Sequence, residues 1–160
     1  MTILSQIELT MRKAKEQDVE QILDLVIRLK KLNEEFDPLF SVSEDARKAG
    51  EQYVRNAIDS QESFVAVAEA GKKVVGMVKV DLRTRIFYTP KKEGRIVDLY
   101  LLPEFRRKGY GEKMVNYVWD SLKGKIDILT VEFPSANKIS TSFYTKLGFR
   151  PIVNIYAKRD

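Results

Sequence analysis

The chain has 160 residues, of which 44% are hydrophobic and 32% charged, and its formal net charge is +5. This length suits one domain with one core, and the mild positive charge suits an anionic ligand without requiring nucleic acid. The sequence contains no cysteine and no histidine. Disulfides, a cysteine acyl-enzyme, a Ser-His-Asp triad and the usual imidazole zinc sites are therefore excluded, and we expect no metal site.

The same composition sets expectations about location and partners. No apolar run approaches the ~20 residues that span a membrane, and the first ten residues are too short and too polar for a signal peptide. We therefore expect a cytoplasmic protein with no membrane partner. Acidic residues are spread among the basic ones, which weakens an interpretation as a nucleic-acid-binding protein.

The first half of the chain shows strand and helix periodicities in turn. They predict a strand over residues 7–12, two helices over residues 19–29 and 43–58, and a hairpin of strands over residues 64–68 and 74–84. Asp18 followed by Gln21 resembles a capping box for the first helix, and Ser43 is a candidate cap for the second.

The second half predicts two more strand–helix pairs and a final strand. The strands cover residues 95–102 and 126–133, the helices run from Gly111 to Leu122 and from Asn137 to Leu147, and the last strand covers residues 149–157. Gly148 occupies the place of a left-handed C-terminal cap. The order β-α-α-β-β-β-α-β-α-β predicts a single α/β domain, with a mixed sheet flanked by helices.

The turn from Arg106 to Gly111 lies between a predicted buried strand and an amphipathic helix. Two glycines allow a sharp turn and close approach of a ligand, and the first amides of a helix lack internal acceptors. With the helix dipole, these features predict an anion site suited to phosphate. A solvated basic turn is the alternative. A Rossmann loop matches less well because Met114 occupies its third glycine position, and no Walker loop is present.

Residues 102–105 (Leu-Pro-Glu-Phe), followed by Arg106-x-x-Gly109-x-Gly111, resemble the acetyl-CoA signature of the GNAT superfamily of N-acetyltransferases. A second block, Asn137-x-x-Ser140-x-x-Phe143-Tyr144-x-x-x-Gly148-Phe149, resembles the other GNAT signature, with Ser140 in place of the commoner alanine. The resemblance is clear over residues 95–149 and covers residues 7–84 in pattern only. It implies acetyl-CoA as the acyl donor, bound by Arg106, Arg107, Lys108, Gly109, Tyr110, Gly111, Glu112, Asn137 and Tyr144.

The resemblance also implies roles for the second block. Tyr144 would lie near the sulfur of coenzyme A, where a phenol that is protonated at neutral pH could donate its proton to the departing thiolate. The alternative is an aromatic side chain that only packs. Asn137 would contact the arm of the coenzyme, or would be only a helix N-cap.

An attacking amine must lose its proton, and two carboxylates are candidate bases. Glu132 lies near the end of a predicted strand, and Asp98 lies mid-strand among apolar residues, where a carboxylate is unusual. Either could be a paired structural charge, and a chain of waters could replace both. The resemblance implies that backbone amides of Leu99, Tyr100 and Leu101 polarise the thioester carbonyl where the strand splays from its neighbour.

These features predict direct, sequential transfer of an acetyl group to a primary amine, on a small molecule or on a protein N-terminus or lysine. Transfer of a longer acyl group and a non-catalytic acyl-CoA-binding regulator are the alternatives. Residues 36–42 and 87–94 are expected to bind the acceptor, whose identity the sequence leaves open. Members of the family are often dimers, so a homodimer is one expected assembly.

Overall fold

The computed structural model describes residues 8–160, so Ile7 of the predicted first strand lies outside the described residues. One mixed sheet of five strands has the order β1-β2-β3-β4-β5, in which the first four strands are antiparallel and β5 runs parallel to β4. The strands are β1 (Leu9–Lys13), β2 (Ser63–Ala70), β3 (Lys73–Thr84), β4 (Lys92–Leu101) and β5 (Ile128–Val131). The helices are α2 (Val19–Asn33), α3 (Ala46–Asp59), α4 (Tyr110–Ser121) and α5 (Lys138–Lys146), with short 3-10 turns η1 (Glu16–Asp18), η2 (Pro38–Phe40) and η3 (Pro103–Phe105).

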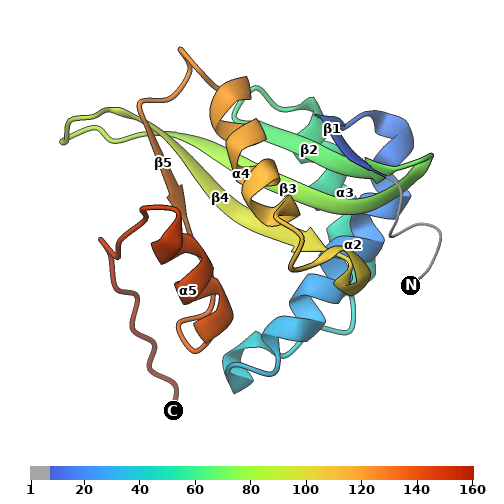
Figure 1. The fold of residues 1–160 in the computed structure, drawn as a ribbon. Coiled ribbons are helices and arrows are strands. Elements are labelled where there is room, and N and C mark those ends of the chain that lie inside the picture. Colours follow the sequence, from blue (N-terminus) through green and yellow to red (C-terminus); the bar gives the residue numbers. More distant parts are fainter. Residues whose placement is uncertain (1–7) are drawn as a thin grey trace.

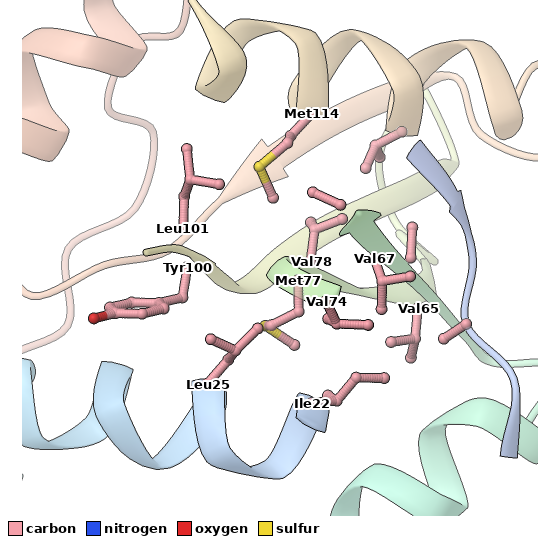
Figure 2. Close-up of a cluster of buried hydrophobic side chains, with 14 of the residues drawn as sticks. Ile22, Leu25, Val65, Val67, Val74, Met77, Val78, Tyr100, Leu101 and Met114 are labelled. Atoms are coloured by element: carbon pink, nitrogen blue, oxygen red, sulfur yellow. The ribbon is translucent and has the colours of Figure 1, made fainter. Parts of the chain in front are cut away.

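Helices cover both faces of the sheet, so most strand positions on either face are buried. Helices α2 and α3 lie on one face and α4 lies on the other, while α5 lies beside the β5 edge (Figure 1). Figure 2 shows the two layers, because Tyr100 points toward Leu25 of α2 while Leu101 points toward Met114 of α4. Successive side chains of a strand point to opposite faces, which explains why β4 contributes to both layers.

Strands β4 and β5 separate partway along their length. Their ladder ends at the pair Ile96 and Val131, and one further bond joins the Glu132 amide to the Ile96 carbonyl at 3.1 Å. The ladder between β3 and β4 continues to Leu101. Beyond Ile96, β4 pairs with β3 only, through residues 98–101, with Val97 left out at a register shift, so its other edge is open as the expected splay requires.

The predicted final strand is wrong. Residues 150–160 form neither helix nor strand, and each of them is exposed. Alternating β-branched and aromatic residues predict a strand only where a second strand offers its hydrogen-bonding edge, and within the described chain no strand pairs with this segment. The element order of the folded chain therefore ends on α5.

The capping box predicted for the first helix is also wrong. The Asp18 carboxylate accepts hydrogen bonds from Arg12 at 2.7 and 2.8 Å and from the Lys15 amide at 2.7 Å, and Gln21 accepts from the Val74 amide. These hydrogen bonds tie the start of α2 to the sheet, which a purely local motif does not anticipate. Within residues 8–160, no helix is long and apolar enough to cross a membrane.

Candidate active site

The predicted phosphate-binding turn precedes α4. Gly109 is the N-cap in a left-handed conformation (φ 81°), which favours glycine because it has no side chain. The first bond into the helix runs from the Lys113 amide to the Gly109 carbonyl, at 3.2 Å. The amides of residues 110–112 therefore have no acceptor inside α4 and are available to an anion.

The two arginines of the turn have different surroundings. The Arg106 Nε atom donates to the Leu101 carbonyl at 2.8 Å, and its guanidinium lies 5.0 Å from the centre of the Tyr100 ring. These contacts tie the turn to the end of β4. Arg107 is exposed and adopts a positive φ of 62°, which is uncommon for a residue with a side chain.

Gly111 joins the two sequence motifs. A Cβ atom at this position would lie 3.0 Å from Cζ and 3.1 Å from Cε1 of Phe143, closer than ordinary van der Waals contact. The Phe143 ring of α5 therefore packs directly against the first turn of α4. Because Tyr144 follows Phe143, this contact brings the turn close to the second motif.

Tyr144 is 6% exposed and lies in a cluster of aromatic rings. Its ring centre is 4.8 Å from that of Phe143 and 5.4 Å from those of Phe133 and Phe149. Burial raises the pKa of Tyr144 above its usual value, because the charged phenolate would lose its hydration. The hydroxyl therefore keeps its proton at neutral pH and can act as a hydrogen-bond donor.

The second motif begins with a confirmed helix cap. Asn137 Oδ1 accepts a hydrogen bond from the Ser140 amide at 3.0 Å, so Asn137 is the N-cap of α5. Its contact with a coenzyme stays a prediction. Gly148 has a φ of 94°, which confirms the left-handed cap expected after this helix.

Backbone amides on the open edge of β4 point toward the space where β4 and β5 have separated. The Leu102 amide donates to the Val75 carbonyl of β3 at 2.9 Å. Amides of successive strand residues point to opposite edges, so those of Leu99 and Leu101 point away from β3. The Tyr100 amide points toward β3. Leu99 and Leu101 thus remain as candidate donors to a thioester carbonyl, whereas the Tyr100 amide does not face the open edge.

Asp98 lies on the α2 and α3 side of the sheet, and its side chain is completely buried. One carboxylate oxygen accepts from Lys30 Nζ at 2.6 Å, and the other accepts a short hydrogen bond from the Tyr53 hydroxyl. A carboxylate with both oxygens engaged and no exposed surface is poorly placed to take a proton from a substrate. Asp98 is thus the buried partner of Lys30 and Tyr53, and its role as a base stays a prediction.

Glu132 has a more accessible environment. Its side chain is 52% exposed, and its nearest cation is Arg95, with Nη1 at 3.9 Å from Oε1. It follows directly after β5, at the point where β5 leaves β4. Of the two predicted bases, Glu132 is the one with an exposed side chain, and its role as a base stays a prediction.

No sequence motif pointed to the residues that surround Asp98. Tyr53 falls within the predicted helix over residues 43–58, and Lys30 and Lys79 stand in no motif. Burial first, and then the charge of Asp98, raise the pKa of Tyr53. Lys79 lies 4.4 Å from the centre of the Tyr53 ring and pairs with Asp81 at 2.6 Å. Only the packing of α2 and α3 on β3 and β4 brings these groups together.

Comparisons with known proteins agree with this geometry. The model of the acetyltransferase (GNAT) family matches residues 29–149. An uncharacterized N-acetyltransferase from Archaeoglobus fulgidus is 35% identical over 63 residues, which are 39% of this chain and 43% of the relative. The match thus spans less than half of that curated relative. The chain belongs to the acetyltransferase (GNAT) family, because the family model covers more than half of it.

Solved structures share the fold at low sequence identity. An aminoglycoside N-acetyltransferase in complex with CoA has a TM-score of 0.71 and 17% identity, covering 96% of this chain and 95% of its own. A ribosomal-protein-alanine N-acetyltransferase from Brucella melitensis biovar Abortus 2308 has a TM-score of 0.71 and 13% identity, covering 96% and 100%. The first acts on a small molecule and the second on a protein, so the shared fold leaves the acceptor open.

Proposed function

We propose that this chain is an N-acetyltransferase that moves an acetyl group directly from acetyl-CoA to a primary amine. The observation that carries the proposal is the open edge of β4 beside the contact between α4 and α5. There, the free amides of residues 110–112, the amides of Leu99 and Leu101, and Tyr144 belong to neighbouring elements. The cytoplasm, where acetyl-CoA is available, is the proposed location.

Each group has a defined task in this proposal. The amides of residues 110–112, with Arg107 and Lys108 nearby, bind the phosphates of the donor. Asn137 contacts its arm. The amides of Leu99 and Leu101 stabilise the negative charge that develops on the thioester oxygen as the amine attacks. These groups need no covalent enzyme intermediate, which is consistent with a chain that lacks cysteine.

Proton movement completes the transfer. Glu132 accepts the proton that the amine must lose, directly or through a water molecule, and Tyr144 donates a hydrogen bond to the departing sulfur. A thiol ordinarily has a pKa near 8.5 and a phenol one of about 10, and burial raises the pKa of Tyr144 further, so the phenol is the weaker acid. We therefore assign Tyr144 to stabilising the thiolate by a hydrogen bond, and a proton that it transfers to the sulfur is replaced from solvent water.

The acceptor is proposed to enter beside η2, one of the two exposed segments expected to bind it. Leu39 and Phe40 lie in η2, and Ile86, Phe87 and Tyr88 lie in the β3–β4 loop, all with exposed side chains. Residues 38–40 follow α2, whose Lys30 contacts Asp98, whereas the β3–β4 loop lies at the end of β4 that is remote from the open edge. Leu39 and Phe40 offer apolar contacts around an amine, which suits a small molecule as well as a peptide N-terminus.

The experiment is a turnover assay of the full chain with acetyl-CoA and a panel of polyamines, aminoglycosides, amino acids and peptide N-termini. Initial rates over a grid of both substrates are expected to give intersecting double-reciprocal lines. Parallel lines with an isolable acetylated enzyme would overturn direct transfer. Tight acetyl-CoA binding without turnover on any amine would favour a non-catalytic regulator, and faster turnover with propionyl-CoA or succinyl-CoA would favour a longer acyl group.

A further inference from the structure

Three consecutive apolar side chains are exposed where the β3–β4 hairpin turns. Ile86, Phe87 and Tyr88 are 69%, 89% and 64% exposed. The hairpin extends beyond the rest of the sheet, so this loop projects from the molecule, at the end of β4 remote from the open edge (Figure 1). Single apolar residues are normal on a protein surface, but three in a row on a projecting loop mark an interaction site. We call residues 83–92 the hairpin tip.

The hairpin tip is strongly basic. It contains no carboxylate and four cationic residues, which are Arg83, Arg85, Lys91 and Lys92. Asp81 and Asp127 contact it from outside, the first at 3.4 Å from Arg83 and the second at 3.3 Å from the Lys92 amide. The cations remain in excess, so the charge of the tip complements an anionic surface.

The loop pairs several of its own backbone polar groups. The Arg85 amide donates to the Lys91 carbonyl at 2.7 Å, and the Tyr88 amide donates to the Arg85 carbonyl at 3.2 Å. The Arg85 guanidinium donates to the Pro90 carbonyl at 2.8 Å, and Lys91 Nζ donates to the Ile86 carbonyl at 2.8 Å. A polar group that is already hydrogen-bonded costs less to remove from water. The tip is therefore suited to an environment that is partly apolar.

We propose that the hairpin tip docks on a membrane surface that contains anionic lipids. Ile86 and Phe87 enter the boundary between headgroups and acyl chains, Tyr88 lies at the level of the headgroups, and the basic residues face the lipid phosphates. Such binding needs no segment that spans the bilayer. It does not depend on the proposed catalytic activity.

A single-stranded nucleic acid fits this surface less well. Such a ligand is bound along a basic groove whose aromatic rings stack on successive bases. The hairpin tip projects instead of forming a groove (Figure 1), and Ile86 has no ring to stack on a base. Apolar side chains at the end of a projecting loop, with cations behind them, match the layered chemistry of a membrane surface.

The test measures co-sedimentation of the full chain with lipid vesicles. We expect binding to phosphatidylcholine vesicles with about a third phosphatidylserine, and binding roughly tenfold or more weaker to phosphatidylcholine alone, because the anionic surface attracts each nearby cation. The variant Ile86→Ser/Phe87→Ser removes apolar surface and leaves every charge in place. It is expected to bind the mixed vesicles roughly tenfold or more weakly, the scale of burying one such side chain.

The matched control is Ile155→Ser/Tyr156→Ser, which removes an isoleucine and an aromatic residue that are also highly exposed, outside the hairpin. It is expected to bind vesicles as the parent does. A parent chain that does not sediment with the mixed vesicles at low salt would overturn the proposal. So would undiminished binding by the tip variant, or an equal loss in the control.

Two further measurements identify other partners of the tip. Binding of the parent to oligouridylate but not to vesicles, with a loss in the tip variant, would assign the tip to nucleic acid and overturn the proposal. Light scattering without lipid is expected to give the same mass for the parent and the tip variant. A lower mass for the variant would assign the tip to a contact between copies of the chain, which would also overturn membrane docking.

Discussion

Replacing Gly111 with alanine tests whether this glycine serves packing or ligand approach. The added Cβ would lie 3.0 Å from the Phe143 ring, so the ring must move by a few tenths of an ångström. Phe143 lies edge-on to Tyr144 with 4.8 Å between ring centres. A shift of the Phe143 ring therefore moves Tyr144, the proposed hydrogen-bond donor to the thiolate. We expect both stability and turnover to fall.

The magnitude follows from two opposing effects. Overpacking typically costs about 1–3 kcal/mol, whereas alanine in a helix is favoured over glycine by up to about 1 kcal/mol. In the Phe143→Leu background the steric cost is relieved, so Gly111→Ala should become neutral or stabilising. The coupling energy should thus be roughly 1–3 kcal/mol. At about 2–4 °C per kcal/mol for a chain of this size, thermal unfolding resolves it.

The assay is a double-mutant cycle of Gly111→Ala and Phe143→Leu, followed by thermal unfolding and by acetyl-CoA calorimetry. Additivity of the unfolding free energies to within about 0.5 kcal/mol would refute the packing role. Calorimetry of acetyl-CoA binding tests whether Gly111 also serves ligand approach. If the glycine also allows the phosphates to approach the backbone, the affinity loss persists in the Phe143→Leu background. Recovery of full affinity there would assign Gly111 to packing alone.

The remaining predictions concern protons. Tyr144→Phe keeps the ring contacts and removes the hydroxyl, so single-turnover rates should fall by roughly 10²-fold while acetyl-CoA affinity changes little; an unchanged rate would leave Tyr144 a packing residue. Glu132→Gln should lower the rate most at low pH, where the amine is mostly protonated, with little loss of stability because the side chain is half-exposed. Asp98→Asn should instead destabilise the fold by about 1–3 kcal/mol, because it removes the charge that the Lys30 amine and the Tyr53 hydroxyl contact; if neither variant alters the pH–rate profile, water replaces a side-chain base. Hydrogen bonds from Arg12 hold the pKa of Asp18 below its usual 3.8. Their stabilisation is therefore present above pH 4 and lost as the pH falls further, and Arg12→Ala should flatten this acid dependence in urea titrations.

Local periodicity was sufficient to place most elements. Helix α4 and the strands of the β2–β3 hairpin follow from apolar spacing and turn residues, which act over a few neighbours along the chain. The two motifs, with Gly109 and Gly148 in left-handed conformations, could likewise be read locally because such backbone angles favour glycine. The sequence therefore predicted the family fold and the elements that carry the site.

The tertiary structure changed the interpretation of particular residues. Gly111 is packed against Phe143, and Asp98 is paired with Lys30 and Tyr53 from two different helices. Those partners are 32 to 68 positions away in sequence, and no periodicity specifies such distant contacts. In the sequence both Asp98 and Glu132 were candidate bases, and only the fold shows that the Asp98 side chain is fully buried whereas that of Glu132 is half-exposed.

Residues 150–160 also show what the sequence determines and what the tertiary structure decides. Its residues favour an extended backbone, and the sequence by itself determined that preference. Whether a strand forms depends on a hydrogen-bonding edge, which another part of a fold or another chain must supply. The folded chain directs this segment away from β5, so its backbone stays unpaired within the described residues although its composition suits a strand.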